Sequence, residues 1–148
     1  MTDGTWVLVA VLVLATALGL FRTARDGRFR GTHRVRGADA TATDAPVSVL
    51  AESDLDHVLG ERATLLQFSS AFCAPCRVTR RVLGEVADLV PGVAHVEIDA
   101  EHHLDLTRRL GIMRTPTTLV LDADGREVTR AAGTPSRDRV LATLANVV

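Results

Sequence analysis

The stretch that decides the fold of this 148-residue chain is Phe72-Cys73-Ala74-Pro75-Cys76, which holds both of its cysteines. Residues 64–69 before it are short, mainly apolar and aromatic-bearing, as in a buried strand. The residues after it repeat apolar side chains every three or four positions, which predicts a helix. The positions expected on its buried face are Val78, Val82, Val86 and Leu89. Pro75 suits the first helical turn, whose amides lack helical partners. Cys73 is therefore expected near a helix N-terminus.

This position favours reactivity of the first thiol. A free cysteine has a pKa of about 8.5, and the positive end of a helix stabilises its thiolate. Cys73 is therefore the expected nucleophile. Cys76 lies one turn further into the helix and is the expected resolving thiol, which attacks the mixed disulfide. Ala74 and Pro75 add no charged group that would stabilise the thiolate, which favours disulfide reduction.

A second motif, Gly111-Ile112-Met113-Arg114-Thr115-Pro116-Thr117, precedes another expected strand. Together with the Cys-x-x-Cys pair, it resembles the thioredoxin family over residues 46–148. The resemblance implies an α/β fold with a mixed β-sheet flanked by helices, and a protein-disulfide reductase activity that needs no cofactor. It also implies disulfide-containing client proteins and an upstream reductant of the thioredoxin-reductase kind.

The resemblance also suggests roles for individual residues. Thr115-Pro116 is similar to the cis-proline loop, which offers the backbone of the residue before proline to substrate. Phe72 stands where thioredoxins usually have tryptophan and keeps a flat apolar rim. The expected substrate-binding residues are Phe72, Ala74, Pro75, Thr115 and Pro116.

Gln67 departs from the family pattern. Thioredoxins generally have a buried aspartate here that exchanges a proton with the second cysteine, and glutamine cannot titrate. Gln67 therefore occupies the position expected for proton transfer but cannot itself transfer a proton. Water, or His95 on the next expected strand, is the candidate replacement. The alternative for His95 is a hydrogen-bonded strand histidine without a catalytic role.

Composition excludes several other classes. A net charge of −1 argues against nucleic acid as a partner. Two cysteines are too few for a disulfide-stapled scaffold or an ordinary structural zinc site, so no metal is expected. Arg77 stands where a haem attachment motif needs histidine.

Residues 4–21 contain no charged side chain and predict a single transmembrane helix, since 18 helical residues span about 27 Å. A cleaved signal peptide is the alternative, although Asp3 stands where a positive segment would be needed. Residues 22–45 are an Arg-rich juxtamembrane segment and flexible linker. Its arginines predict a cytoplasmic domain, because such clusters stay on that side. They are Arg22, Arg25, Arg28, Arg30, Arg34 and Arg36.

The domain at 46–148 alternates expected strands and helices. The remaining strands are expected at 47–50, 93–98, 117–121 and 127–131, and helices at 53–59, 104–110 and from Thr134-Pro135 onward. Two other functions stay open. One is an extracytoplasmic thioredoxin-like protein for cytochrome maturation or envelope disulfides. The other is a non-catalytic adaptor that holds a partner beside Pro116.

Overall fold

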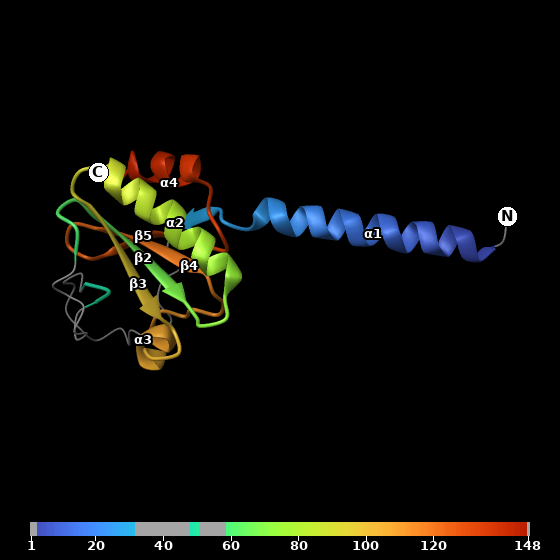
Figure 1. Cartoon of the computed structure of the whole chain (residues 1–148), viewed down its shortest axis with the longest axis horizontal. Helices are drawn as coiled ribbons and strands as arrows, with labels where there is room; N and C mark the ends of the chain where they lie inside the picture. The colour runs from blue at the N-terminus through green and yellow to red at the C-terminus, as the bar shows by residue number, and fades with distance from the viewer. Residues whose placement is uncertain (1–2, 32–47, 51–58, 148) are drawn as a thin grey trace.

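The computed structural model describes residues 3–31, 48–50 and 59–147. Its helices are α1 (Asp3–Arg25), α2 (Ala74–Leu89), α3 (Leu104–Arg109) and α4 (Arg137–Leu144). Its strands are β1 (Phe29–Gly31), β2 (Ala63–Ser69), β3 (Val93–Asp99), β4 (Thr117–Asp122) and β5 (Glu127–Ala132). Figure 1 shows the sheet and its helices as one body from which α1 projects as a separate arm.

The strands form one sheet in the order β1-β5-β4-β2-β3. β2 and β3 run parallel, whereas the other neighbouring pairs are antiparallel. The expectation of a mixed sheet flanked by helices is therefore confirmed. The parallel register of β2 and β3 sets Gln67 beside Glu97, which matters for the site described below.

Helices cover both faces of the sheet. On one face, Leu65 of β2 packs in a cluster with Leu83 of α2 and Val140 of α4. On the other face, Leu66 and its neighbours pack in a cluster with side chains of α3. Every residue of β2 is buried, and each fully buried leucine or phenylalanine there stabilises the fold by about 2 kcal/mol. Alternate residues of β2 therefore pack against the helices on opposite faces of the sheet. Gln67 lies on the face covered by α2.

The predicted buried face of α2 is partly wrong. Val78 and Leu89 are 55% and 54% exposed. The buried residues are Cys76, Thr79, Leu83 and Val86. A polar residue can occupy this face because the Thr79 hydroxyl contacts the Pro75 carbonyl oxygen and the Thr134 hydroxyl, both at 3.1 Å. The buried face of α2 therefore includes Thr79 in place of Val78.

Most of the other expected elements agree with the structure. The strands at 64–69, 93–98, 117–121 and 127–131 are confirmed, as are the helices near 104–110 and after Pro135. The strand expected at 47–50 is wrong for residues 48–50, which form a turn whose Val49 amide donates to the Gly125 carbonyl oxygen. Val47 and residues 53–58 of the helix expected over 53–59 lie outside the described residues, and Leu59 is not helical.

The end of α1 is joined to the sheet by a short ordered connection. α1 continues to Arg25, and β1 pairs antiparallel with β5. Gly27 makes the turn between them with φ +67°, and a Cβ there would lie 2.1 Å from the Thr134 carbonyl oxygen. The described part of the expected flexible segment at 22–45 is thus helix, turn and strand, and residues 32–45 lie outside the described part. The domain boundaries stay a prediction.

Candidate active site

Cys73 and Cys76 form a disulfide at the start of α2, with their Cα atoms 5.2 Å apart. Cys73 is the N-cap residue of this helix, and its Sγ accepts a hydrogen bond from the Cys76 amide at 3.1 Å. Cys76 is 2% exposed, whereas Cys73 is only partly buried. An amide donor and a helix N-terminus both favour a thiolate at Cys73 after reduction. The outer sulfur is therefore the one that a second disulfide can approach.

The loop before β4 packs next to the redox loop. The Thr115–Pro116 peptide is cis, as the resemblance implied. The Thr115 and Ser70 hydroxyls lie 3.0 Å apart and join the two loops. Pro116 is buried, and its carbonyl oxygen accepts a hydrogen bond from the Gly133 amide at 2.8 Å. These contacts hold the loop of Thr115 against the redox loop.

Each of these two loops carries one large apolar side chain that is almost fully exposed. Phe72 is 99% exposed and Met113 is 92% exposed. Ala74 and Pro75 are exposed beside the disulfide. Sequence reasoning proposed Phe72 but gave Met113 no role, although it lies two residues before Thr115 in the quoted motif. Exposed apolar side chains on both loops provide a surface that another protein can cover.

A polar depression of about 400 Å³ lies against the disulfide. Its lining residues are Ser69, Ser70, Ala71, Cys73, Cys76, Arg77, Arg80, Glu97 and Asp99. Arginine and carboxylate side chains therefore share an open space with both sulfurs. Within residues 3–31, 48–50 and 59–147, no group of three or more His, Cys, Asp or Glu side chains is arranged to hold a metal ion.

Gln67 is fully buried at the base of this region, and all its polar atoms have partners. Its Nε2 donates to the Cys76 carbonyl oxygen at 3.0 Å and to Glu97 Oε1 at 3.4 Å. Its Oε1 lies 3.2 Å from His95 Nε2. Since the amide oxygen can only accept, His95 Nε2 must carry the proton in this contact. Gln67 thus holds the backbone of Cys76, Glu97 and His95 in one network.

Glu97 and Asp99 are titratable residues beside the disulfide that sequence reasoning missed, and Glu97 is the one joined to Gln67. Its carboxylate forms an ion pair with Arg80 and accepts a hydrogen bond from the Ser69 hydroxyl at 2.6 Å. Burial raises the pKa of Glu97, but the hydrogen bonds from Arg80 and Ser69 and the charge of Arg80 outweigh it, so the pKa is lowered overall. Glu97 is therefore ionised at neutral pH beside the cysteine pair. No local sequence signal marks Glu97, because it reaches the site through the pairing of β2 with β3.

His95, which lies near Glu97, is neutral at pH 7. Burial lowers its pKa below the usual 6.5, and the nearby Glu97 carboxylate only partly opposes this effect. Its hydrogen-bond partner is Gln67. His95 therefore contacts the amide oxygen of Gln67, whereas the Cys76 carbonyl oxygen contacts the amide nitrogen of the same side chain.

Comparison with known proteins agrees with this geometry. The thioredoxin-like domain family matches residues 57–147. The chain belongs to the thioredoxin-like family. It is 32% identical over 92 residues to thioredoxin of Alicyclobacillus acidocaldarius, covering 62% of this chain and 87% of that protein. It is 30% identical over 98 residues to thioredoxin H4-1 of Oryza sativa, covering 62% and 74%.

Solved structures show the same fold. A mutant thioredoxin from Halobacterium salinarum superposes with a TM-score of 0.58 at 23% identity, over 72% of this chain and 96% of that one. Fasciola hepatica thioredoxin superposes with a TM-score of 0.54 at 21% identity, over 64% and 88%. The chain is a thioredoxin-type thiol-disulfide oxidoreductase, and its family implies disulfide-containing clients and a reductant in general.

Proposed function

We propose that this protein reduces disulfides of client proteins through Cys73 and Cys76 while α1 anchors it in a membrane. The observation that carries the chemistry is the cap geometry of α2, in which Cys73 Sγ accepts an amide hydrogen bond and Cys76 is buried. The Cys73 thiolate attacks one client sulfur, and the other client sulfur leaves as a thiolate. Cys76 then attacks Cys73 Sγ, which releases the client thiol and forms the disulfide of the oxidised protein. The client gains two electrons and the dithiol loses them.

Client binding involves both loops in this proposal. Phe72, Ala74 and Pro75 contribute from the redox loop, and Thr115 and Pro116 from the loop that the Ser70 contact holds beside it. The exposed side chain of Met113 extends this apolar rim. A client segment lying across both loops would bring its disulfide to Cys73.

The resolving step needs a proton acceptor for Cys76, and we assign this role to Glu97. Its carboxylate and Cys76 line the same open depression, which has room for a water molecule to carry the proton between them. The lowered pKa makes Glu97 a weak base, which should keep this step slow. His95 is less suited, because its Nε2 donates to Gln67 and Gln67 directs only donor groups toward Cys76.

The membrane role depends on α1. Within the span Gly4–Arg25, the 18-residue apolar window has a mean hydropathy of 2.3 and is not buried by the rest of the protein. A helix of this length can cross the hydrocarbon layer, and a signal sequence would pass the same test. We infer a retained single-pass anchor with the domain in the cytoplasm, because Arg22 and Arg25 lie in its last turn.

The catalytic proposal is tested by reduction of insulin disulfides with the purified chain and a chemical reductant. The unmodified protein should accelerate precipitation of the insulin chains, and Cys73→Ser should remove the acceleration. A non-catalytic adaptor would accelerate nothing in either form.

Anchoring is tested separately in cells. The protein should sediment with membranes, need detergent for release, and resist protease added to intact cells. Digestion of the domain from outside would place it on the opposite side and support the extracytoplasmic alternative.

A further inference from the structure

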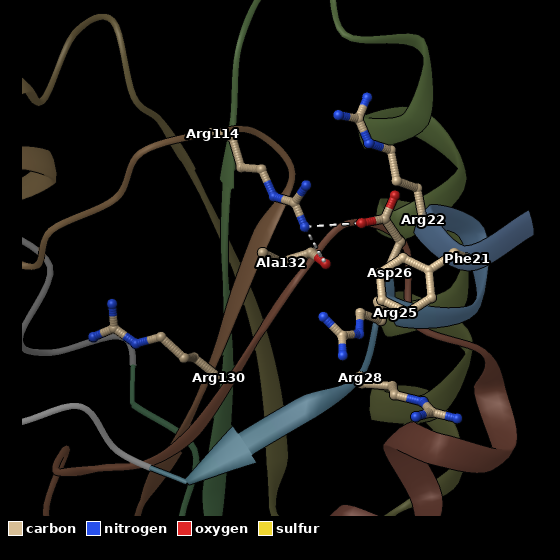
Figure 2. A pocket seen from close by; sticks show the side chains of 8 residues that line it. All are labelled: Phe21, Arg22, Arg25, Asp26, Arg28, Arg114, Arg130 and Ala132. Carbon is tan, nitrogen blue, oxygen red and sulfur yellow. Dashed lines mark hydrogen bonds and ion pairs between the residues drawn. The ribbon is translucent and has the colours of Figure 1, made fainter. Parts of the chain in front are cut away.

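An arginine-lined cavity of about 440 Å³ lies where α1 meets the thioredoxin-like domain. Figure 2 shows its lining side chains, which are Phe21, Arg22, Arg25, Asp26, Arg28, Arg114, Arg130 and Ala132. They come from the end of α1, the turn before β1, the loop before Pro116, and β5. Neither cysteine lines this cavity, so it is separate from the depression beside the disulfide.

Most of the positive charge in the cavity has no carboxylate partner among the residues that the structure describes. Arg130 forms an ion pair with Glu127, and Arg114 Nη2 lies 2.9 Å from Asp26 Oδ1. Within the described part of the chain, the remaining cationic lining residues form no ion pair; they are Arg22, Arg25 and Arg28. Arg25 stacks 4.2 Å above the centroid of the Phe21 ring. The cavity is therefore a concentration of cationic guanidinium groups around one carboxylate.

Backbone contacts fix the two walls of the cavity relative to each other. The Gly27 amide donates to the Ala132 carbonyl oxygen at 2.8 Å, and Arg139 Nη1 donates to the Asp26 carbonyl oxygen at 3.4 Å. Pairing of Phe29 with Ala131 continues the connection into the sheet. A ligand of this cavity thus meets a site that is already formed, which limits the entropy lost on binding.

The apolar surface of α1 ends at the cavity. Every side chain that the structure describes from Trp6 to Phe21 is exposed, and Phe21 itself lines the cavity. Arg22 follows directly in the sequence. If α1 spans the bilayer, the cavity therefore lies at the depth of the lipid headgroups.

We propose that this cavity binds the phosphate group of an anionic phospholipid headgroup. The inference rests on the membrane anchoring proposed above. Planar guanidinium groups bind phosphate oxygens through paired hydrogen bonds, and the cavity offers them from α1 and from the domain together. A bound phosphate would compete with Asp26 for Arg114, which lies one residue before Thr115 in the cis-proline loop. The lipid would thus hold the domain at the membrane surface through a defined contact.

The test uses the full-length chain in detergent and measures lipid retention by native mass spectrometry. The probes are dioleoyl phosphatidylglycerol, dioleoyl phosphatidylcholine and inorganic phosphate. The double variant Arg22→Gln/Arg25→Gln breaks no ion pair among the described residues, and Arg114→Gln removes one cation of the domain side. The matched control is Arg81→Gln/Arg137→Gln, which removes the same charge from exposed helical positions outside the cavity.

The proposal expects phosphatidylglycerol to be retained in preference to phosphatidylcholine. Arg22→Gln/Arg25→Gln should weaken phosphatidylglycerol binding roughly 25-fold, because each basic residue at an anionic surface contributes about fivefold. Arg114→Gln should weaken it as well, and the control variant should not. Equal retention of the two lipids, or an equal loss in the control, would overturn the proposal. Displacement of the lipid by inorganic phosphate at an equal concentration would show a site for free phosphate and would also overturn it. Failure of the anchoring proposal would appear separately, as a protein that does not sediment with membranes.

Discussion

Replacing Gln67 by aspartate tests how this site moves the proton of Cys76. The substitution introduces a carboxylate at a fully buried position and removes the amide that donates to the Cys76 carbonyl oxygen at 3.0 Å. The lost hydrogen bond costs about 0.5–1.5 kcal/mol, because the Cys76 carbonyl oxygen lies within α2 and still accepts the helical amide of the next turn. Burial and the neighbouring Glu97 carboxylate should both raise the pKa of the new acid, and each unit adds about 1.4 kcal/mol at neutral pH.

The sign of the pH dependence follows from this raised pKa. The charged form is disfavoured in the folded protein, so the electrostatic cost is absent below the unfolded pKa of about 3.9 and complete above the folded pKa. Gln67→Asp should therefore be less stable than the unmodified protein by a margin that grows as pH rises. Urea unfolding at several pH values measures this margin. A pH-independent difference would refute the expected burial of the carboxylate.

The same change should accelerate catalysis, because a base with a raised pKa accepts a thiol proton more readily than the ionised Glu97 does. General bases contribute roughly 10²–10⁴-fold in rate, and an acceleration of about tenfold near pH 7 is a conservative expectation. Stopped-flow reaction with a chromogenic disulfide separates attack by Cys73 from resolution by Cys76, since each step releases a coloured thiolate. An unchanged second phase between pH 6 and 9 would refute the idea that proton transfer limits resolution.

Three further outcomes are expected. Glu97→Gln should slow the second phase and make the rate of that phase rise more steeply with pH. The pKa of Glu97 is lowered in the folded protein, so the carboxylate stabilises the fold at neutral pH. This stabilisation is lost as pH falls through the folded pKa. His95→Ala should change that phase much less than Glu97→Gln does, and a larger loss would assign the proton to the imidazole. Gly27→Ala should loosen the junction of α1 with the domain, since its Cβ would collide with the Thr134 carbonyl oxygen, and limited trypsin digestion should then cut there faster. Gly84→Ala on α2 is the control, because its Cβ meets nothing within 4 Å; equal digestion of both variants would contradict the collision argument.

The sequence predicted the architecture well where periodicity and turn residues agreed. β2 is a seven-residue buried strand, and Gly111 ends the α3 segment with φ +64°. The cis-proline loop, by contrast, was expected from the resemblance to thioredoxins. The strand and the helix end are of another kind. These features depend on neighbours in the sequence, and a single chain displays them directly.

Features that depend on partners distant in sequence were not predicted. Thr79 is buried because Thr134, far along the chain, accepts a hydrogen bond from its hydroxyl, and helical periodicity cannot reveal that partner. β1 forms because β5 offers an open edge for its three residues. Glu97 joins the site through the register of two parallel strands, which local pattern does not determine.

The central claim is that Cys73 attacks a client and Cys76 releases it, and trapping of the mixed disulfide tests it most directly. A client protein with one labelled disulfide is mixed with Cys73→Ser or Cys76→Ser, and adducts are counted on non-reducing gels. The account predicts that Cys76→Ser accumulates a covalent adduct that reductant dissolves, because the buried resolving thiol is missing, whereas Cys73→Ser forms none. Adducts with Cys73→Ser and none with Cys76→Ser would contradict the roles assigned to the two sulfurs.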